Sequence, residues 1–256
     1  MLSQQPLAAA AADLQAGHTP AAIAERIARL PRQSYLRDFV YGAIDGTVTT
    51  FAVVAGVVGA DMSASVIIVL GLANVVADGF SMAVSNYLGT KSQREELHRA
   101  RRTEERHIDL IPDGEADEIR EIFRQKGFDG ELLERIVQVV TSNRKLWVET
   151  MLTDEWGLTL TTPVPWRAGL MTFVAFVVAG MLPLLPFIVA AINGRSQTAF
   201  GWSISLAALA FFGIGAIKSW FVGHSWWRSG LETLTLGGGA ALLAYVTGAL
   251  LKSFAT

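Results

Sequence analysis

Two aspartates lie inside stretches of sequence that are otherwise apolar. Asp45 and Asp78 each fall within a run long enough to cross a membrane. An ionised carboxylate is costly in hydrocarbon, so such groups usually face a cavity or a partner and indicate an ion or proton path. Polar and thioether side chains recur every fourth residue around Asp78, along one side of a helix: Asn74, Asp78, Met82 and Asn86. This pattern predicts a metal path, and the alternative it leaves open is a pair of acids that only holds a helix interface.

A second group of potential metal ligands lies in the acidic middle of the chain. It comprises Glu104 and His107, Glu115 and Glu118, and Met151 and Glu155, in pairs three or four residues apart. Carboxylate, imidazole and thioether groups suit a borderline divalent ion such as ferrous iron, whereas magnesium and calcium do not use sulfur. By spacing alone, an ordinary solvated charged face explains these residues better, and Met151 by itself would fill a core.

The composition is too apolar for an ordinary soluble domain. Hydrophobic residues make up 51% of the chain and charged residues only 17%. Of the 23 acidic and 21 basic residues, 16 and 12 lie between Leu88 and Gly157, so the flanking regions are almost free of charge. The absence of cysteine excludes a thiolate metal site. The net charge of -2 gives no reason to expect nucleic acid as a partner.

Five segments are apolar over the roughly 20 residues that a helix needs to cross the hydrocarbon. They are about Phe39–Ala60, Ser63–Leu88, Ala168–Asn193, Ala199–Val222 and Gly230–Leu251. We therefore predict an all-α integral membrane protein with five transmembrane helices and a helical insert between the second and third. The predicted organisation is an N-terminal tail with a short amphipathic helix (1–34), two spans (35–90), an acidic metal-binding insert (91–160) and three spans (161–256).

The insert is predicted to consist of helices. The first continues the second span to about Leu110, and a turn follows at Pro112-Asp113-Gly114. A second helix is predicted from Glu115 to Lys126, and a third begins after a cap at Asp129. A fourth is predicted from Asn143 to Trp156, with Gly157 as a left-handed cap at its end. In the tail, Thr19-Pro20 predicts the start of a helix that reaches Leu30.

Basic residues near short loops predict the orientation in the membrane. Four arginines precede the first span, the loop at Asp61-Met62 has no basic residue, and the insert carries twelve. This pattern predicts that the N-terminus and the insert are cytosolic and that the C-terminus is outside. We expect a bacterial cytoplasmic membrane because the tail is short and plain, with a vacuolar membrane as the alternative.

Three motifs carry a resemblance to a known family. The runs YGAIDG (41–46), ADGFSMA (77–83) and MLTDEWGL (151–158) resemble the vacuolar iron transporter family, and the similarity covers about residues 35–251. The resemblance implies a homodimer with the translocation path between the subunits, moving ferrous iron out of the cytosol against protons.

The resemblance also implies roles for individual residues. Asp45 and Met82 would line the path, and the insert would bind metal through Glu104, Glu115, Glu118, Glu155 and Met151. His107 stands where another glutamate is expected, which removes a charge and adds sensitivity to pH near neutrality. Leu152 stands where the family often has a second methionine, and Asn74 stands where an acidic residue of the path is expected. The substrate could therefore be manganese or another divalent metal.

Two other classes of function have partial support in the sequence. The pairs Glu95-x-x-His98 and Glu104-x-x-His107 suggest a di-iron carboxylate oxidase, which needs the pairs on facing helices. Here nine steps of about 100° put them on opposite faces of one helix. A membrane-anchored metal sensor would need one span only. We predict a transporter with no tightly bound cofactor, whose partners are divalent metal ions such as Fe²⁺ and Mn²⁺, protons, membrane lipid and a second copy of the chain.

Overall fold

The computed structural model describes residues 14–15, 17–28, 34–194, 198–223 and 225–255, and its elements within this part of the chain are all helices. The chain divides into two units, residues 1–34 and 35–256. In the first unit, helix α2 (Pro20–Ala28) begins where Thr19-Pro20 predicts. The Thr19 hydroxyl accepts a hydrogen bond from the Ala22 backbone N–H at 3.3 Å, as a helix cap does. The predicted end at Leu30 lies outside the described residues.

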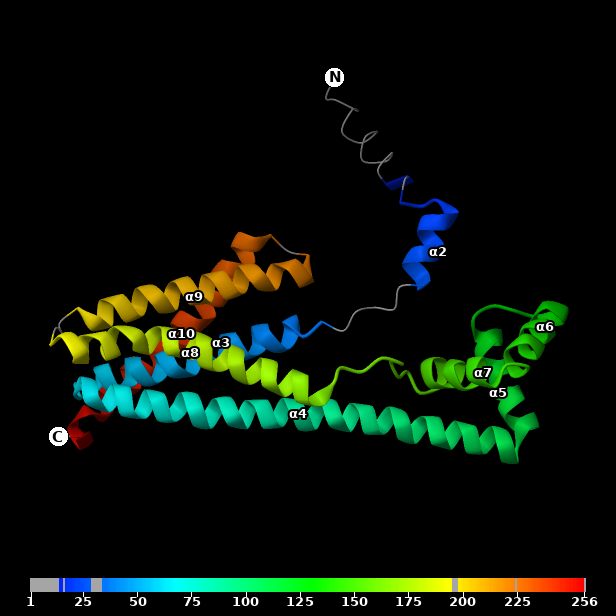
Figure 1. The fold of residues 1–256 in the computed structure, drawn as a ribbon, viewed down its shortest axis with the longest axis horizontal. Helices are drawn as coiled ribbons and strands as arrows, with labels where there is room; N and C mark the ends of the chain where they lie inside the picture. Colours follow the sequence, from blue (N-terminus) through cyan, green and yellow to red (C-terminus); the bar gives the residue numbers. More distant parts are fainter. Residues whose placement is uncertain (1–13, 16, 29–33, 195–197, 224, 256) are drawn as a thin grey trace, which may run out of the picture. The chain divides into compact units, whose positions relative to one another are not determined.

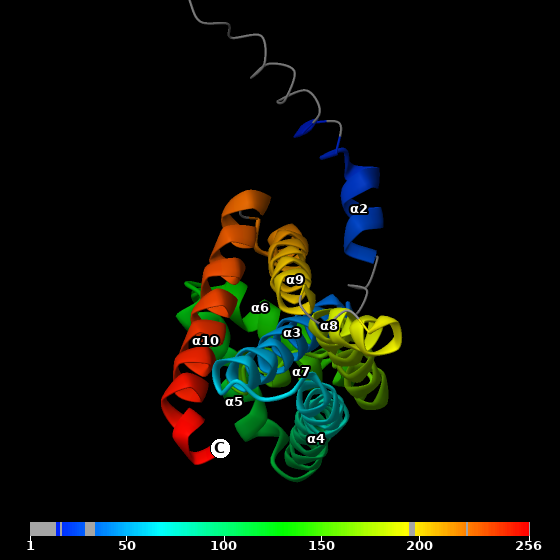
Figure 2. The ribbon, with the colours of Figure 1, turned by 90° about the vertical axis from the view of Figure 1, so that its left-hand side faces the viewer.

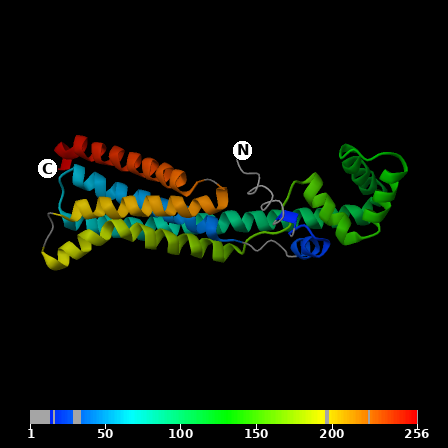
Figure 3. The same ribbon diagram turned by 90° about the horizontal axis from the view of Figure 1, so that it is seen from above.

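Five helices of the second unit are long and apolar enough to cross a membrane. They are α3 (Leu36–Gly59), α4 (Ala64–Leu110), α8 (Pro165–Asn193), α9 (Ala199–Val222) and α10 (Trp226–Ala255). These bounds confirm the five predicted spans, several of which extend by a few residues. They also confirm the predicted class, an all-α integral membrane protein. Figure 3 shows the five spans side by side.

Helix α3 is the central element of the membrane bundle. It contacts α4, α8, α9 and α10, and Figure 2 shows it among these helices when the bundle is seen end on. Gly42 and Gly46 let it approach α8 closely, because a Cβ atom at either position would overlap the backbone of Thr172 or Phe176. The GxxxG spacing therefore serves helix packing here.

The outward faces of the bundle are apolar. Side chains such as Val76, Phe80, Leu236 and Leu243 are exposed on α4 and α10. A soluble monomer rarely exposes apolar surface on this scale, whereas hydrocarbon accommodates it without cost. The multi-pass membrane assignment follows from these faces together with helix length.

Helix α4 continues without a break from the membrane bundle into the insert (Figure 1). It ends at Leu110 because the residue before a proline is disfavoured in the helical region, and Ile111 takes a non-helical conformation before Pro112. The predicted turn at Pro112-Asp113-Gly114 is wrong. These residues form the first turn of α5 (Pro112–Gln125), where proline is well tolerated because its missing N–H would have no partner there.

The rest of the insert begins its helices where the sequence predicts, and it differs in the last one. Helix α6 (Gly130–Thr141) begins after Asp129, which holds the cap position without a side-chain cap hydrogen bond. Helix α7 (Arg144–Thr150) begins after Asn143, whose side-chain oxygen accepts from the Leu146 N–H at 3.1 Å. The predicted fourth helix to Trp156 is interrupted at Met151 by a π-helical turn, η1 (Met151–Glu155). Gly157 adopts the expected left-handed conformation, with φ of 65°.

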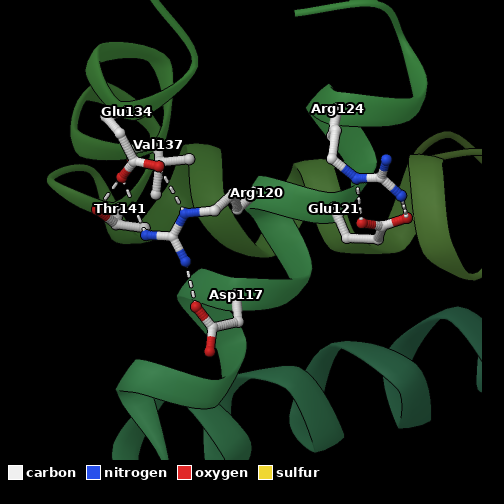
Figure 4. A network of polar contacts seen from close by, with 7 residues as sticks. All are labelled: Asp117, Arg120, Glu121, Arg124, Glu134, Val137 and Thr141. Atoms are coloured by element: carbon white, nitrogen blue, oxygen red, sulfur yellow. Dashed lines mark hydrogen bonds and ion pairs between the residues drawn. The ribbon is translucent and has the colours of Figure 1, made fainter. Parts of the chain in front are cut away.

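Ion pairs and an apolar core hold the insert helices together. Arg120 on α5 donates to both carboxylate oxygens of Glu134 on α6, at 2.8 and 3.1 Å, and also pairs with Asp117 (Figure 4). In the same insert, Ile119, Val148 and Leu152 are fully or almost fully buried in one hydrophobic cluster. The insert thus has a core of its own that fixes the directions of its polar side chains.

Candidate metal-binding and translocation sites

Three of the predicted insert ligands come together in the structure. Glu104 and His107 lie one turn apart near the end of α4, and Glu115 lies in the first turn of α5. One ligand atom from each of the three lies within 4.8 Å of the others. The break at Ile111 produces this arrangement, because it turns α5 back so that its first turn faces the last turns of α4.

The two glutamates of this cluster are buried although they are acidic. Glu104 is 2% exposed and Glu115 is 1% exposed. One carboxylate oxygen of each, Oε2, is buried without a hydrogen-bond partner. A buried carboxylate without a partner is costly, and a divalent cation is one species that would offset that cost.

The remaining oxygens of the two carboxylates have defined contacts. The Trp156 indole Nε1–H donates to Glu104 Oε1 at 2.9 Å. His107 Nδ1 lies 3.2 Å from Glu115 Oε1. Each glutamate is therefore held through one oxygen by a neighbouring residue, and the two carboxyl groups also hydrogen-bond to one another when Glu115 is protonated.

Without a bound cation, the burial and mutual repulsion of these carboxylates favour their protonated forms. Burial raises the pKa of Glu115 to about 8, and the negative charges of Glu118, Glu104 and Glu155 and a side-chain hydrogen bond with Glu104 add to this effect. The pKa of Glu155 is also raised, first by burial and then by the charges of Glu104 and Glu118, while His107 lowers it. A cation bound among these groups would displace protons.

Glu118 and Glu155 lie at the edge of the cluster. Both are exposed, and neither belongs to the group of three whose ligand atoms converge. Their charges nevertheless act on Glu115, so they are close enough to join a shared site.

Met151 is fully buried within the hydrophobic core of the insert, beside Leu152. Its role as a ligand stays a prediction. The π-helical turn that begins at Met151 changes the direction of the chain before Glu155 and Trp156, and such turns are frequent at functional sites. Trp156 was not predicted from spacing as a site residue, although it belongs to the 151–158 motif.

The predicted path residues of α4 share one half-buried face of that helix: Asn74, Asp78, Met82 and Asn86. The Asn74 side-chain amide donates to the carboxylate of Asp78, while its own carbonyl oxygen is buried without a partner. Asp45 on α3 is also half-buried, and it lies near enough to Asp78 for the two charges to interact. Within the described residues neither aspartate has a basic partner.

Asn86 links three helices at the end of the predicted path nearest the insert. Its side-chain amide donates to Asp38 on α3 at 2.8 Å and to the Thr172 hydroxyl on α8 at 2.7 Å. Thr172 was not predicted from sequence, and the only signal for it was a hydroxyl in an otherwise apolar span.

The second Glu-x-x-His pair does not join the cluster. Glu95 lies 3.6 Å from Lys91, and both Glu95 and His98 line a different cavity near the membrane bundle. The continuous helix α4 keeps this pair roughly 13 Å from the Glu104 pair along its axis.

Comparison with known proteins decides the family. A model of the VIT family matches residues 36–249, which include the insert and almost all of the five spans. This chain belongs to the VIT family.

Individual relatives agree with this membership. The chain is 36% identical over 214 residues to vacuolar iron transporter 2 of Oryza sativa subsp. japonica, covering 82% of this chain and 85% of the relative. It is 34% identical over 225 residues to a vacuolar iron transporter of Toxoplasma gondii, covering 85% and 74%. Vacuolar iron transporter 1 of Arabidopsis thaliana is 32% identical over 213 residues, covering 82% and 83%. These VIT relatives are named as transporters and not as enzymes, in agreement with the prediction that the chain is not an oxidase.

Proposed function

We propose that this chain moves ferrous iron, or another divalent metal such as manganese, out of the cytosol in exchange for protons. The observation that carries the proposal is the pair of buried carboxylates, Glu104 and Glu115, each with an oxygen that lacks a partner, beside His107. The same chain carries two acids at membrane depth, Asp45 and Asp78. The relatives named as iron transporters support iron as the first substrate to test.

In this proposal the insert collects the metal. The ion binds to Glu104, His107 and Glu115, with Glu118, Glu155 and Met151 as further ligands. Because Glu115 holds its proton up to a pH of about 8, binding of a cation near neutral pH releases that proton.

The ion then passes along the membrane path. Asp45 and Asp78 supply charge, Met82 supplies a soft sulfur, and Asn74 and Asn86 supply amide oxygens. The contact between Asn86 and Asp38 lies at the end of the path nearest the insert, which is where an ion leaving the insert would enter.

A homodimer with the path between its subunits fits the surface of α4. A ridge of small residues beside the path is exposed in the single chain: Ala73, Ala77, Ser81 and Ser85. Small side chains let membrane helices approach closely, so this ridge is suited to a second copy. We place the N-terminus and the insert in the cytosol, and we favour a bacterial cytoplasmic membrane over a vacuolar one.

The test is transport by the full chain in proteoliposomes. Uptake of Fe²⁺ and Mn²⁺ is measured with and without an imposed pH gradient, for the parent, Asp45→Ala and Met82→Ala. We expect gradient-dependent flux in the parent and at least a tenfold loss in both variants. Met171→Ala is the matched control, because Met171 lies in a span but is 37% exposed and outside the path.

Two results would count against the proposal. Flux in Asp45→Ala and Met82→Ala equal to that of the parent would remove the assigned path. Metal binding by the full chain without flux of any tested ion would favour the sensor alternative.

A further inference from the structure

Two cavities meet on one face of α4 and α8, away from the residues assigned to the path. The first is lined by Lys91, Arg94, Glu95 and His98 of α4 together with residues at the start of α8, and its volume is about 400 Å³. The second is almost entirely apolar, lies deeper along the same two helices and is also about 400 Å³. Tyr87 and Trp166 line both cavities, so the two adjoin, and we call them the upper and lower parts of one groove.

The upper part of this groove carries positive charge. Lys91 is partly neutralised by Glu95 at 3.6 Å. Arg94 has no ion pair within the part of the chain that the structure describes. Arg167 stacks over the Trp166 ring at 5.3 Å from its centre and adds a further cation beside the shared wall. An anionic ligand is therefore favoured at this end.

The lower part suits a hydrocarbon chain. Phe80, Leu170 and Phe173 line it, and Phe80 and Leu170 are 65% and 52% exposed. Gly169 lies at its base, where a Cβ atom would crowd the Ala83 carbonyl oxygen, so the close approach of α8 to α4 shapes the floor of the groove. No charged side chain lines this part.

The junction of the two parts is where we expect the membrane surface. Tyr87 and Trp166 lie where the apolar part of α4 ends and its charged part begins, and these two residue types are enriched at membrane interfaces. A ligand that fits the whole groove must have an anionic head at the surface and an apolar chain in the hydrocarbon.

We propose that this groove is a binding site for an anionic phospholipid of the leaflet on the insert side. The headgroup phosphate lies against Lys91 and Arg94, and one acyl chain lies along Phe80, Leu170 and Phe173. Basic pockets between membrane helices bind anionic headgroups in this way. The site is independent of the metal ligands and does not rest on the transport proposal.

The test measures lipid binding by the metal-free full chain in detergent, by native mass spectrometry and by the shift of its thermal unfolding midpoint. Dioleoyl phosphatidylglycerol is titrated against dioleoyl phosphatidylcholine. We expect the parent to bind phosphatidylglycerol more tightly than phosphatidylcholine. Each basic side chain that is removed should weaken the affinity for phosphatidylglycerol about fivefold, once in Arg94→Gln and twice in Lys91→Gln/Arg94→Gln. Leu170→Gln, at an exposed position, should weaken binding severalfold through the acyl chain.

Arg102→Gln is the matched control, since Arg102 is an exposed arginine roughly 12 Å further along α4 and lines neither cavity. An equal loss in Arg102→Gln would show a general attraction to basic surface and overturn the site. An equal thermal shift with inorganic phosphate alone would overturn the acyl-chain part. Because the chain has no cysteine, Leu170→Cys gives a unique thiol. An efficient disulfide between two such chains would show that a second copy covers the groove instead.

Discussion

Trp156 donates its indole N–H to Glu104 across 52 positions of sequence, at 2.9 Å. The bond fixes one carboxylate oxygen of Glu104 and leaves the other without a partner in a buried position. The tryptophan follows a π-helical turn, and the glutamate lies on the helix that continues from the membrane. The orientation of a predicted metal ligand therefore depends on an element that lies far away in sequence.

We expect Trp156→Phe to weaken metal binding about tenfold, because groups that orient a ligand typically contribute 10- to 100-fold in affinity. An aromatic ring is kept, while the indole N–H that donates to Glu104 is lost together with part of the ring. Competition with a metal-sensitive dye on the full chain measures the change. Trp202→Phe on α9, where the ring is 64% exposed, is the control. Unchanged affinity in Trp156→Phe would show that the hydrogen bond does not position Glu104 for metal.

The stability of the metal-free protein should fall as pH rises from about 5 to 8.5. The pKa of Glu115 is about 8 in the folded chain, against an ordinary value of 4.5, so the folded state binds this proton more tightly than the unfolded state. The stabilisation is complete below pH 4.5 and is lost as pH rises through 8. Thermal unfolding midpoints measured across this range in detergent test the prediction.

Variants at two glutamates isolate the contribution of Glu115. Glu115→Gln should remove most of the decline with pH, because its amide does not titrate. Glu131→Gln, at an exposed position in the first turn of α6, should retain it. A decline of the same size in Glu115→Gln would assign the pH dependence to other groups.

Gly46→Ala should destabilise the membrane bundle by about 1 to 3 kcal/mol, the usual cost of overpacking. The new Cβ would overlap the Phe176 carbonyl oxygen of α8, and a backbone atom cannot move aside as a flexible side chain can. Gly201→Ala on α9 is the control, since a Cβ atom there meets nothing within 4 Å. Unfolding in a graded denaturant series compares the two, and equal stabilities would mean that α3 and α8 pack less closely than described.

Arg120→Ala should make the insert more susceptible to local unfolding, and hence to proteolysis, than Arg124→Ala does. Arg120 joins α5 to Glu134 on α6 through two hydrogen bonds, whereas Arg124 pairs with Glu121 on its own helix (Figure 4). Both arginines are on the surface, so both effects should be small and should shrink as salt screens the charges. Limited proteolysis of the insert at low and high salt measures the difference. The reverse order would contradict a linking role for Arg120.

The sequence alone determined the five spans, the continuation of the second span into the insert and the positions of most helix ends. These features follow from local causes: runs of apolar residues, the conformational limits before proline at Ile111 and the left-handed conformation of Gly157. The turn predicted at Pro112 failed because proline is compatible with both a turn and a helix start, and the residues that follow it favoured the helix.

Only the tertiary structure decided which polar residues meet. Spacing placed Glu104 near His107 on one helix, but Glu115 joins them because the chain reverses at Ile111. Trp156 and Thr172 reach Glu104 and Asn86 from elements 52 and 86 positions away in sequence. The physical reason is that helix periodicity orders side chains over a few turns, whereas contacts between helices depend on packing of the whole bundle.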